Sequence, residues 1–461
     1  MEEFHGSWWI AARPEQRVRG ILRVDEAGEL CLDTFSLLAA HDLGATDNDS
    51  QPVRIVGETE SRSYVTLEGC IRRSVRLLVE QPRETWMAAQ AVFGLHFEPD
   101  EPWAFFGASF EMPLVSGWMG PASTETAVEF DSLDRPHRLV IAASIDAHPL
   151  WSTPSCTVEL VKAVEAKPTS EAITRFTARS DVRALSTESL LAEEFIRIAV
   201  RPLQVLIGLS TGRYTAPLRG SVFNEPLKEG ASLRPFTRRW HALSVSSAGG
   251  DPRYGFYYAD FAALSSESRM RWLSRWAALR PVHDLYLATL QGNTFLEQRF
   301  LFLAQALETY HRLTYSRELL PSDAWADLRE RMKGAIDLVP SGVPRRHDAL
   351  QALNTKLTYF NEIGLRARVK EVLSVLGKLG DQIAGDAGVA AFASSVTDTR
   401  NYFTHWSMDL ESKALRSADL PYATSRLHAA LEVLLLREVG FANDSPALNE
   451  VMSRRVAWLP R

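Results

Sequence analysis

The feature that most constrains the fold is a change in the spacing of apolar residues near residue 260. Residues 1–145 contain short apolar runs, rich in β-branched and aromatic residues and separated by Gly and Pro, which is typical of strands. From Ser265 onward apolar residues recur at helical spacing, as at Met270, Leu273 and Trp276. A chain with one such change is expected to fold as a β-rich part followed by a helical part.

We therefore predict an α+β fold in two parts. Many short strands favour a sandwich or a barrel-like sheet over residues 1–260, with room for two subdomains. Residues 261–292 are interpreted as a helical linker, and residues 293–445 as several antiparallel helices joined by short loops, which form a bundle. A chain of 461 residues is long enough for two or three domains.

The two predicted parts differ in charge. Residues 1–261 hold 26 Lys+Arg against 35 Asp+Glu, a balance of −9, whereas residues 262–461 hold 25 against 22, a balance of +3. A basic surface suits a polyanion such as RNA better than an acidic surface does. The excess in the second part is small, so an ordinary solvated surface explains it equally well.

One segment of the helical part carries residues suited to phosphate chemistry. Arg400 offers a permanent, forked positive charge that matches phosphate, and His405 is of the type that exchanges protons near neutral pH. Together they can cleave a phosphodiester without a metal, because His moves protons and Arg stabilises the charge that builds on phosphate. The chain has no second Arg-x4-His pair, although its 43 Arg and 11 His predict about one by chance.

Helical spacing separates these two groups. At about 100° per residue, Arg400 lies roughly 140° around a helix from His405, whereas Asn401 and His405 share a face. One helix therefore does not direct both groups to one point. A second copy of the motif, supplied by a dimer partner across a two-fold axis, would complete the site.

Arg400-Asn401-x-x-x-His405 resembles the signature of HEPN domains, a family of helical ribonucleases and RNA-binding modules. Other segments resemble the ApeA-type anti-phage proteins, which combine an N-terminal domain with a HEPN domain. The segments that carry this second resemblance are Gly6–Trp9, Val18–Leu22, Ile55–Gly57, Val65–Leu67, Phe93–Phe97, Phe300–Tyr310, Leu365–Leu373 and Asp398–Tyr402.

The resemblance implies an abortive-infection protein in which a HEPN-like helical bundle is a metal-independent endoribonuclease. The β-rich region would sense an infection signal, such as a phage-derived trigger. The ribose 2′-hydroxyl of the RNA substrate would attack the adjacent phosphate, with His405 as general base or acid and Arg400 at the phosphate. Asn401 would hold the substrate or orient His405. HEPN domains typically dimerise across this motif, so a homodimer or higher homo-oligomer is expected.

Two further sets of residues are candidates for the site. Glu308 lies on the first HEPN-like helix and is a candidate partner for Arg400; the alternative is a solvated helix charge. The basic residues Arg366, Arg368 and Lys370 are candidate contacts for the RNA backbone, and here too a solvated helix face is the alternative.

Two other functions stay open. In the first, the HEPN-like module binds RNA or protein without catalysis, and the motif only stabilises a dimer. In the second, the chain is a serine hydrolase, because residues 208–212, Gly-Leu-Ser-Thr-Gly, match the nucleophile elbow with Ser210 at its centre. The residues that follow do not begin a helix, so we interpret this segment as a Gly-bounded turn.

Several classes of function lack a motif. The chain has no HExxH, Walker A or G-x-G-x-x-G pattern, and Cys31, Cys70 and Cys156 have no metal-ligand spacing. We therefore expect no metal and no cofactor. Three widely separated cysteines suit a reducing cytoplasm, and the acidic start does not resemble a signal peptide. No apolar stretch approaches ~18 residues, so we expect no membrane contact.

Overall fold

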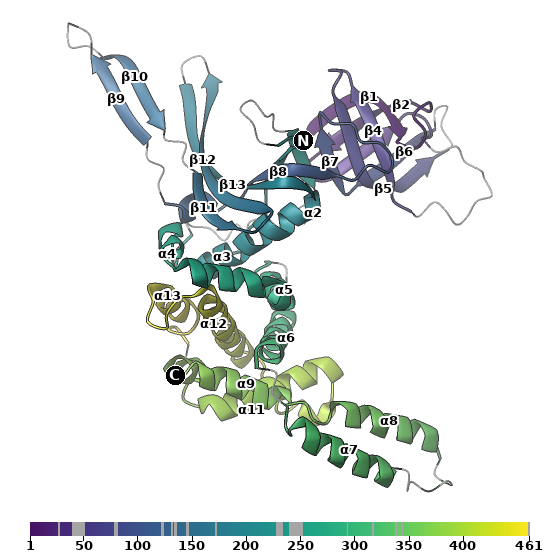
Figure 1. The fold of residues 1–461 in the computed structure, drawn as a ribbon, viewed down its shortest axis with the longest axis vertical. Coiled ribbons are helices and arrows are strands. Elements are labelled where there is room, and N and C mark those ends of the chain that lie inside the picture. Colours follow the sequence, from purple (N-terminus) through teal and green to yellow (C-terminus); the bar gives the residue numbers. More distant parts are fainter. Residues whose placement is uncertain are drawn as a thin grey trace. The chain divides into compact units, whose positions relative to one another are not determined.

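The computed structural model divides the chain into two compact units, Met1–Ser266 and Glu267–Arg461. It describes all residues except 26–27, 39–50, 78–81, 121–123, 131, 133–135, 144–146, 171–172, 227–233, 239–251, 293, 316–317, 337–339, 341, 343 and 460–461. For residues 124–128, 130, 136–143, 163–170, 173–179, 234 and 238 it describes the backbone alone. Strands dominate the first unit and helices make up the second (Figure 1), which confirms the predicted α+β class.

The first unit begins with a closed, six-stranded antiparallel barrel. Its strands are β1 (Glu2–Ile10), β2 (Val18–Val24), β3 (Leu30–Thr34), β4 (Val53–Thr59), β5 (Tyr64–Arg76) and β6 (Arg83–Ala88). They pair in the order β1-β2-β3-β6-β5-β4, and β4 pairs with β1 to close the ring. The predicted sandwich or barrel-like sheet is therefore a barrel.

Alternating residues of these strands fill the barrel. Trp8, Leu22, Leu67 and Trp86 point inward and are almost fully buried, and removal of such apolar surface from water is the main force that stabilises a fold. Gly57 on β4 makes room for the Trp8 ring, because a Cβ at Gly57 would lie 2.3 Å from two ring atoms.

The sheet continues beyond the barrel from β5. It passes through β7 (Gln90–Phe93), β15 (Arg234–Arg238), β14 (Arg219–Phe223), β8 (Ala104–Glu111), β13 (Ile173–Leu191), β12 (Cys156–Ser170) and β11 (Ala147–Ser152). A separate antiparallel pair consists of β9 (Thr124–Phe130) and β10 (Pro136–Ala143). The helical segments of this unit are α1 (Val115–Trp118), α2 (Ala192–Phe195), a π-helical turn (Ile196–Val200), α3 (Arg201–Thr211) and α4 (Tyr258–Ala262).

The second unit is a helical bundle. Its elements are α5 (Ser266–Thr289), α6 (Leu296–Tyr315), α7 (Ser322–Ile336), α8 (Arg346–Tyr359), α9 (Leu365–Val375), α10 (Lys378–Ala384), α11 (Gly388–His405), a 3-10 turn (Met408–Leu410), α12 (Asp419–Val439) and α13 (Pro446–Arg455). Helix α6 packs against α9, α11 and α12. Residues 261–292, expected to be a helical linker, contain α5, which buries Trp272 and Tyr286. Among the described helices, none has the length and apolar character needed to cross a membrane.

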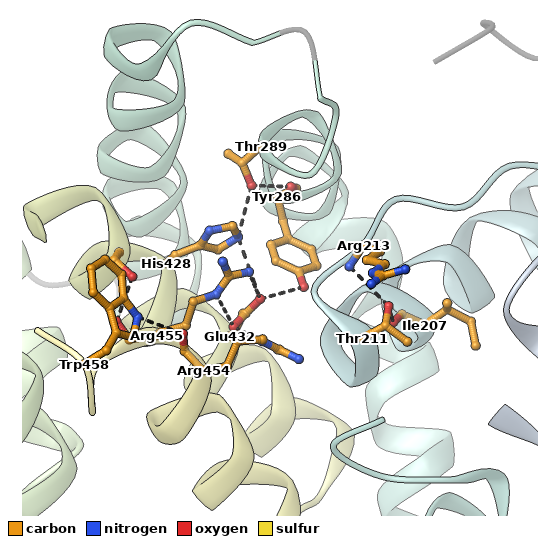
Figure 2. Close-up of polar contacts among 11 residues, drawn as sticks. Ile207, Thr211, Arg213, Tyr286, Thr289, His428, Glu432, Arg454, Arg455 and Trp458 are labelled. Atoms are coloured by element: carbon orange, nitrogen blue, oxygen red, sulfur yellow. Dashed lines mark hydrogen bonds and ion pairs between the residues drawn. The ribbon is translucent and has the colours of Figure 1, made fainter. Parts of the chain in front are cut away.

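A buried ion cluster connects α5, α12 and α13 (Figure 2). The fully buried Glu432 accepts hydrogen bonds from Arg455 at 2.8 and 3.1 Å, from Arg454 at 3.2 Å and from the Tyr286 hydroxyl at 3.2 Å. Burial raises the pKa of the Glu432 carboxyl, but the charges of Arg455 and Arg454 outweigh this effect and hold the pKa below its ordinary value. We call these four residues, with the buried His428 3.7 Å from Glu432, the Glu432 cluster.

Candidate active site

Helix α11 presents the motif residues in the second unit. The helix runs to His405, and Trp406 ends it in a left-handed conformation, with φ 51° and ψ 36°. Because the helix is continuous, the roughly 140° offset between Arg400 and His405 is retained. Arg400 is directed towards α6, whereas His405 is exposed at the end of α11.

The Arg400 guanidinium is held by two acceptors. It donates to the Glu308 carboxylate on α6 at 3.4 Å and to the Asn401 side-chain oxygen at 3.1 Å. The Arg400 side chain is 34% exposed, so solvent still reaches it. Three residues that the sequence indicated separately, Glu308, Arg400 and Asn401, therefore lie together. A forked cation in this position has donors left for a phosphate oxygen.

Glu308 belongs to a longer chain of ion pairs that joins α6, Glu362 in the segment before α9, and α9 itself. Its second oxygen accepts from Arg312 at 3.3 Å, and Arg312 also pairs with Glu362 at 3.1 Å. From Glu362 the network continues through Arg368, at 3.6 Å, to the buried His311, which contacts the partly exposed Glu371 at 2.8 Å. We call these residues, together with Arg400 and Arg368, the Glu308 network. The sequence analysis missed Arg312, although its four-residue spacing from Glu308 is a recognisable helix pair.

The three basic residues of α9 have different environments. Arg368 is buried, with 3% of its surface exposed, and donates to the Ile363 carbonyl oxygen at 2.6 Å and to His311 at 3.3 Å. The expected RNA contact is therefore wrong for Arg368, whose guanidinium is enclosed between helices and has a structural role. Arg366 and Lys370 are exposed, and Arg366 pairs with Asp398 at 3.4 Å.

The end of α11 is open to solvent. Trp406 is 67% exposed, although its ring lies 5.4 Å from Tyr402 and 6.3 Å from Phe403 between centroids. A bulky residue with left-handed backbone costs free energy, and such residues cluster at functional sites. Within the described chain, no side chain hydrogen-bonds to the His405 imidazole, so its nitrogens are accessible to a substrate. The sequence analysis did not single out Trp406.

The segment around Ser210 is the end of a helix and not the predicted Gly-bounded turn. Ser210 lies in α3, and Gly212 ends this helix with left-handed backbone. The Ser210 side chain is fully buried and donates to the Phe256 carbonyl oxygen at 2.7 Å. A nucleophile elbow needs an exposed hydroxyl at a strand-to-helix turn, so this geometry argues against the serine hydrolase.

The described part of the chain contains no group of three or more His, Cys, Asp or Glu side chains arranged to hold a metal ion. What it brings together at α6 and α11 is a half-exposed arginine, fixed by a glutamate and an asparagine, near the helix end that bears an exposed histidine. A helical bundle with this motif, preceded by a β-barrel unit, defines the class of two-part proteins with a HEPN-like module.

Family comparisons identify both parts. The family described as Apea-like HEPN matches residues 301–445, and the family described as ApeA N-terminal domain 1 matches residues 3–260. The chain therefore belongs to the ApeA family of anti-phage defence proteins, with a HEPN module. HEPN domains are generally ribonucleases, which supports a nuclease role. No curated protein and no solved structure matches the chain.

Proposed function

We propose that this protein is a metal-independent endoribonuclease that cleaves RNA in abortive infection, with Arg400 and His405 as catalytic residues. The observation that carries the proposal is the fixed orientation of Arg400 by Glu308 and Asn401 on the helix that ends at the exposed His405. Electrostatic groups oriented in advance stabilise a transition state without the cost of reorganisation.

The proposed reaction is an internal transesterification. A general base removes the proton of the ribose 2′-hydroxyl, and the 2′-oxygen forms a bond to the adjacent phosphorus. The bond from phosphorus to the 5′-oxygen breaks, and a general acid protonates the departing oxygen. His405 serves as base or acid, and Arg400 stabilises the charge on the phosphoryl oxygens. The products are a 2′,3′-cyclic phosphate and a 5′-hydroxyl.

A homodimer of the helical units would supply both proton-transfer groups. The roughly 140° between Arg400 and His405 on α11 prevents one helix from directing both at the same phosphorus. A two-fold interface brings the same patch of two chains together, so one His405 would act as base and the other as acid. Sedimentation at micromolar concentration should then show a species larger than the 51.6 kDa chain. A strictly monomeric, fully active enzyme would contradict this arrangement.

The β-rich unit is proposed to recognise a product of infection and to control the helical unit. Support comes from the family match alone, which is an argument by analogy. A cytoplasmic site of action suits a nuclease that meets cellular RNA.

The test is whether purified protein, alone or with phage lysate, fragments cellular RNA in the presence of EDTA. We expect fragmentation by the wild type and none detectable by His405→Ala, with unchanged circular dichroism. A protein that binds RNA equally well in both forms and cleaves in neither is a non-catalytic HEPN module, and this result would overturn the proposal.

A further inference from the structure

The outer face of the barrel carries a row of arginines around an exposed aromatic ring. In β2, Arg19 points outward, and its carbonyl oxygen accepts from the backbone N–H of Phe35, just after β3. Phe35 is 36% exposed, and the Arg83 guanidinium of β6 lies over its ring, 5.5 Å from the centroid. Arg83 pairs in register with Arg76 of β5. The row therefore crosses four neighbouring strands as Arg19, Phe35, Arg83 and Arg76, which we call the arginine row.

A fourth arginine, Arg73, lies close to this row, on the same strand as Arg76. Arg73 occupies the irregular position between Arg72 and Ser74, where the register of β5 against β6 shifts. The Arg73 side chain is exposed, so it adds a further positive charge to this part of β5.

In the described part of the barrel, little negative charge opposes these arginines. On β3, Asp33 is the acidic residue at an outward position. Its carboxylate forms an ion pair with Arg23 and accepts a hydrogen bond from the Thr85 hydroxyl at 2.7 Å. Among the described residues, no carboxylate forms an ion pair with Arg19, Arg76 or Arg83. The basic face stands out because residues 1–261 carry a balance of −9.

The direct pairing of Arg76 with Arg83 on neighbouring strands lowers the stability of the sheet. Like charges placed directly opposite each other on neighbouring strands destabilise a sheet. An anionic ligand would remove this repulsion, because a phosphate between two guanidinium groups accepts hydrogen bonds from both. Phe35, between Arg19 and Arg83, supplies a ring face on which a base can stack, as aromatic residues do in proteins that bind single strands.

We propose that the arginine row binds single-stranded nucleic acid, with the phosphates on Arg19, Arg76 and Arg83 and a base on Phe35. Four strands at about 4.8 Å spacing give the row a length of roughly 14 Å along the curved sheet, which accommodates a short stretch of unpaired strand. Paired bases do not expose the face that Phe35 requires, so duplexes bind more weakly. This activity is separate from cleavage and assigns a ligand class to the β-rich unit.

The experiment measures binding of labelled oligonucleotides to the full chain carrying His405→Ala, which prevents degradation of the probe. Probes are single-stranded RNA, single-stranded DNA and a duplex of the same sequence. Arg76→Glu with Arg83→Glu should weaken single-strand binding about tenfold or more. The slope of the logarithm of the binding constant against the logarithm of the salt concentration should also become less steep by about 1.4. This value is about 0.7 for each of the two phosphates that the variant no longer neutralises. Phe35→Leu should weaken binding about fivefold or more, because the stacked ring is removed.

The matched control reverses two other exposed arginines, Arg197→Glu with Arg280→Glu. Among the described residues, each pairs with a carboxylate three or four positions away in the sequence. This control makes the same change in net charge and should alter affinity less than about twofold. If the Arg76/Arg83 variant fails to fold, Arg19→Glu tests the other end of the row. Equal weakening by the control, duplex binding as tight as single-strand binding, or equal competition by poly-glutamate would overturn the proposal. Because no cleavage is measured, these outcomes are independent of the proposed ribonuclease activity.

Discussion

The helical unit contains two clusters of arginine and glutamate that differ in their access to water. In the Glu432 cluster the carboxylate is fully buried, and Arg454, Arg455 and Tyr286 occupy its two oxygens. In the Glu308 network the carboxylate also contacts two arginines, but Arg400 is one-third exposed and has donors to spare. The same residue types are thus closed off in one place and accessible in the other.

This difference separates stability from chemistry. A buried ion pair loses its hydration, so its partners must satisfy each other, and removal of one partner leaves an unpaired buried charge. A half-exposed pair contributes roughly 0–1 kcal/mol to stability and can exchange a partner for a substrate. We therefore expect changes in the Glu432 cluster to affect unfolding and changes around Arg400 to affect cleavage.

Within the Glu308 network, the largest effect on cleavage is expected for Arg400→Ala. Loss of the charge that stabilises the transition state should reduce the rate by a factor of about 10²–10⁴, or roughly 3–5 kcal/mol, with unchanged circular dichroism. Arg400→Lys is the matched control, since it keeps the charge but loses the forked geometry, and it should retain more activity. Wild-type rates in a folded Arg400→Ala variant would remove this residue from the mechanism.

Glu432→Gln should have the largest effect on unfolding. It leaves Arg454 and Arg455 without their counter-charge and should cost about 3–5 kcal/mol, which lowers the melting temperature by roughly 6–20 °C for a unit of this size. Glu330→Gln, on an exposed side chain that pairs with Lys333, is the control and should change stability by less than about 0.5 kcal/mol. Equal melting temperatures for the two variants would contradict the structural role of the Glu432 cluster.

Buried histidines should make the helical unit sensitive to acid. Burial lowers the pKa of His283 to about 3 and that of His428 well below its ordinary value, so both stay neutral in the folded protein. In the unfolded chain they take up protons below about pH 6.5. Stability present above that pH is therefore lost as the pH falls, by roughly 1.4 kcal/mol per pH unit for each histidine. The pKa of Glu432 is lowered in the folded protein, so this residue adds a further loss of stability below about pH 4.5.

His283→Phe tests the pH prediction. Neither ring nitrogen of His283 has a hydrogen-bond partner among the described residues, and Trp276 stacks on the ring at 4.1 Å, so phenylalanine can replace it without losing a hydrogen bond. Thermal unfolding between pH 7 and pH 5 should show a shallower decline for the variant than for the wild type. Parallel curves would show that His283 does not take part.

The smallest effect is expected for Glu308→Gln. Glutamine keeps an oxygen near Arg400 but removes the charge that orients it, so cleavage should slow by up to about tenfold while stability changes by less than about 1 kcal/mol. Arg312→Gln removes the other arginine on the same carboxylate and should slow cleavage less. Both variants are compared by their initial cleavage rates on one RNA. A greater loss of rate in Arg312→Gln than in Glu308→Gln would contradict the role assigned to Glu308.

Sequence spacing predicted the division into strands and helices, because apolar periodicity depends on local geometry. The resemblance to HEPN domains indicated Glu308 as a candidate partner of Arg400, and the two side chains lie 3.4 Å apart. Sequence spacing did not predict that Arg368 is buried, since one face of α9 packs on α6 and a charge at that position is indistinguishable from an exposed one. Barrel closure depends on the pairing of β1 with β4 and of β3 with β6. These strands lie far apart in the sequence, and no local pattern encodes such pairings.

End-group analysis of the RNA fragments tests the central claim most directly. The proposed attack by the 2′-hydroxyl leaves a 2′,3′-cyclic phosphate, or the 3′-phosphate formed when it opens, and a 5′-hydroxyl. A single 2′-deoxy substitution on the 5′ side of the cut should block cleavage at that position, and EDTA should not inhibit. Mass spectrometry of the products would contradict the account if the fragments carry 5′-phosphates, or if DNA is cut at a comparable rate.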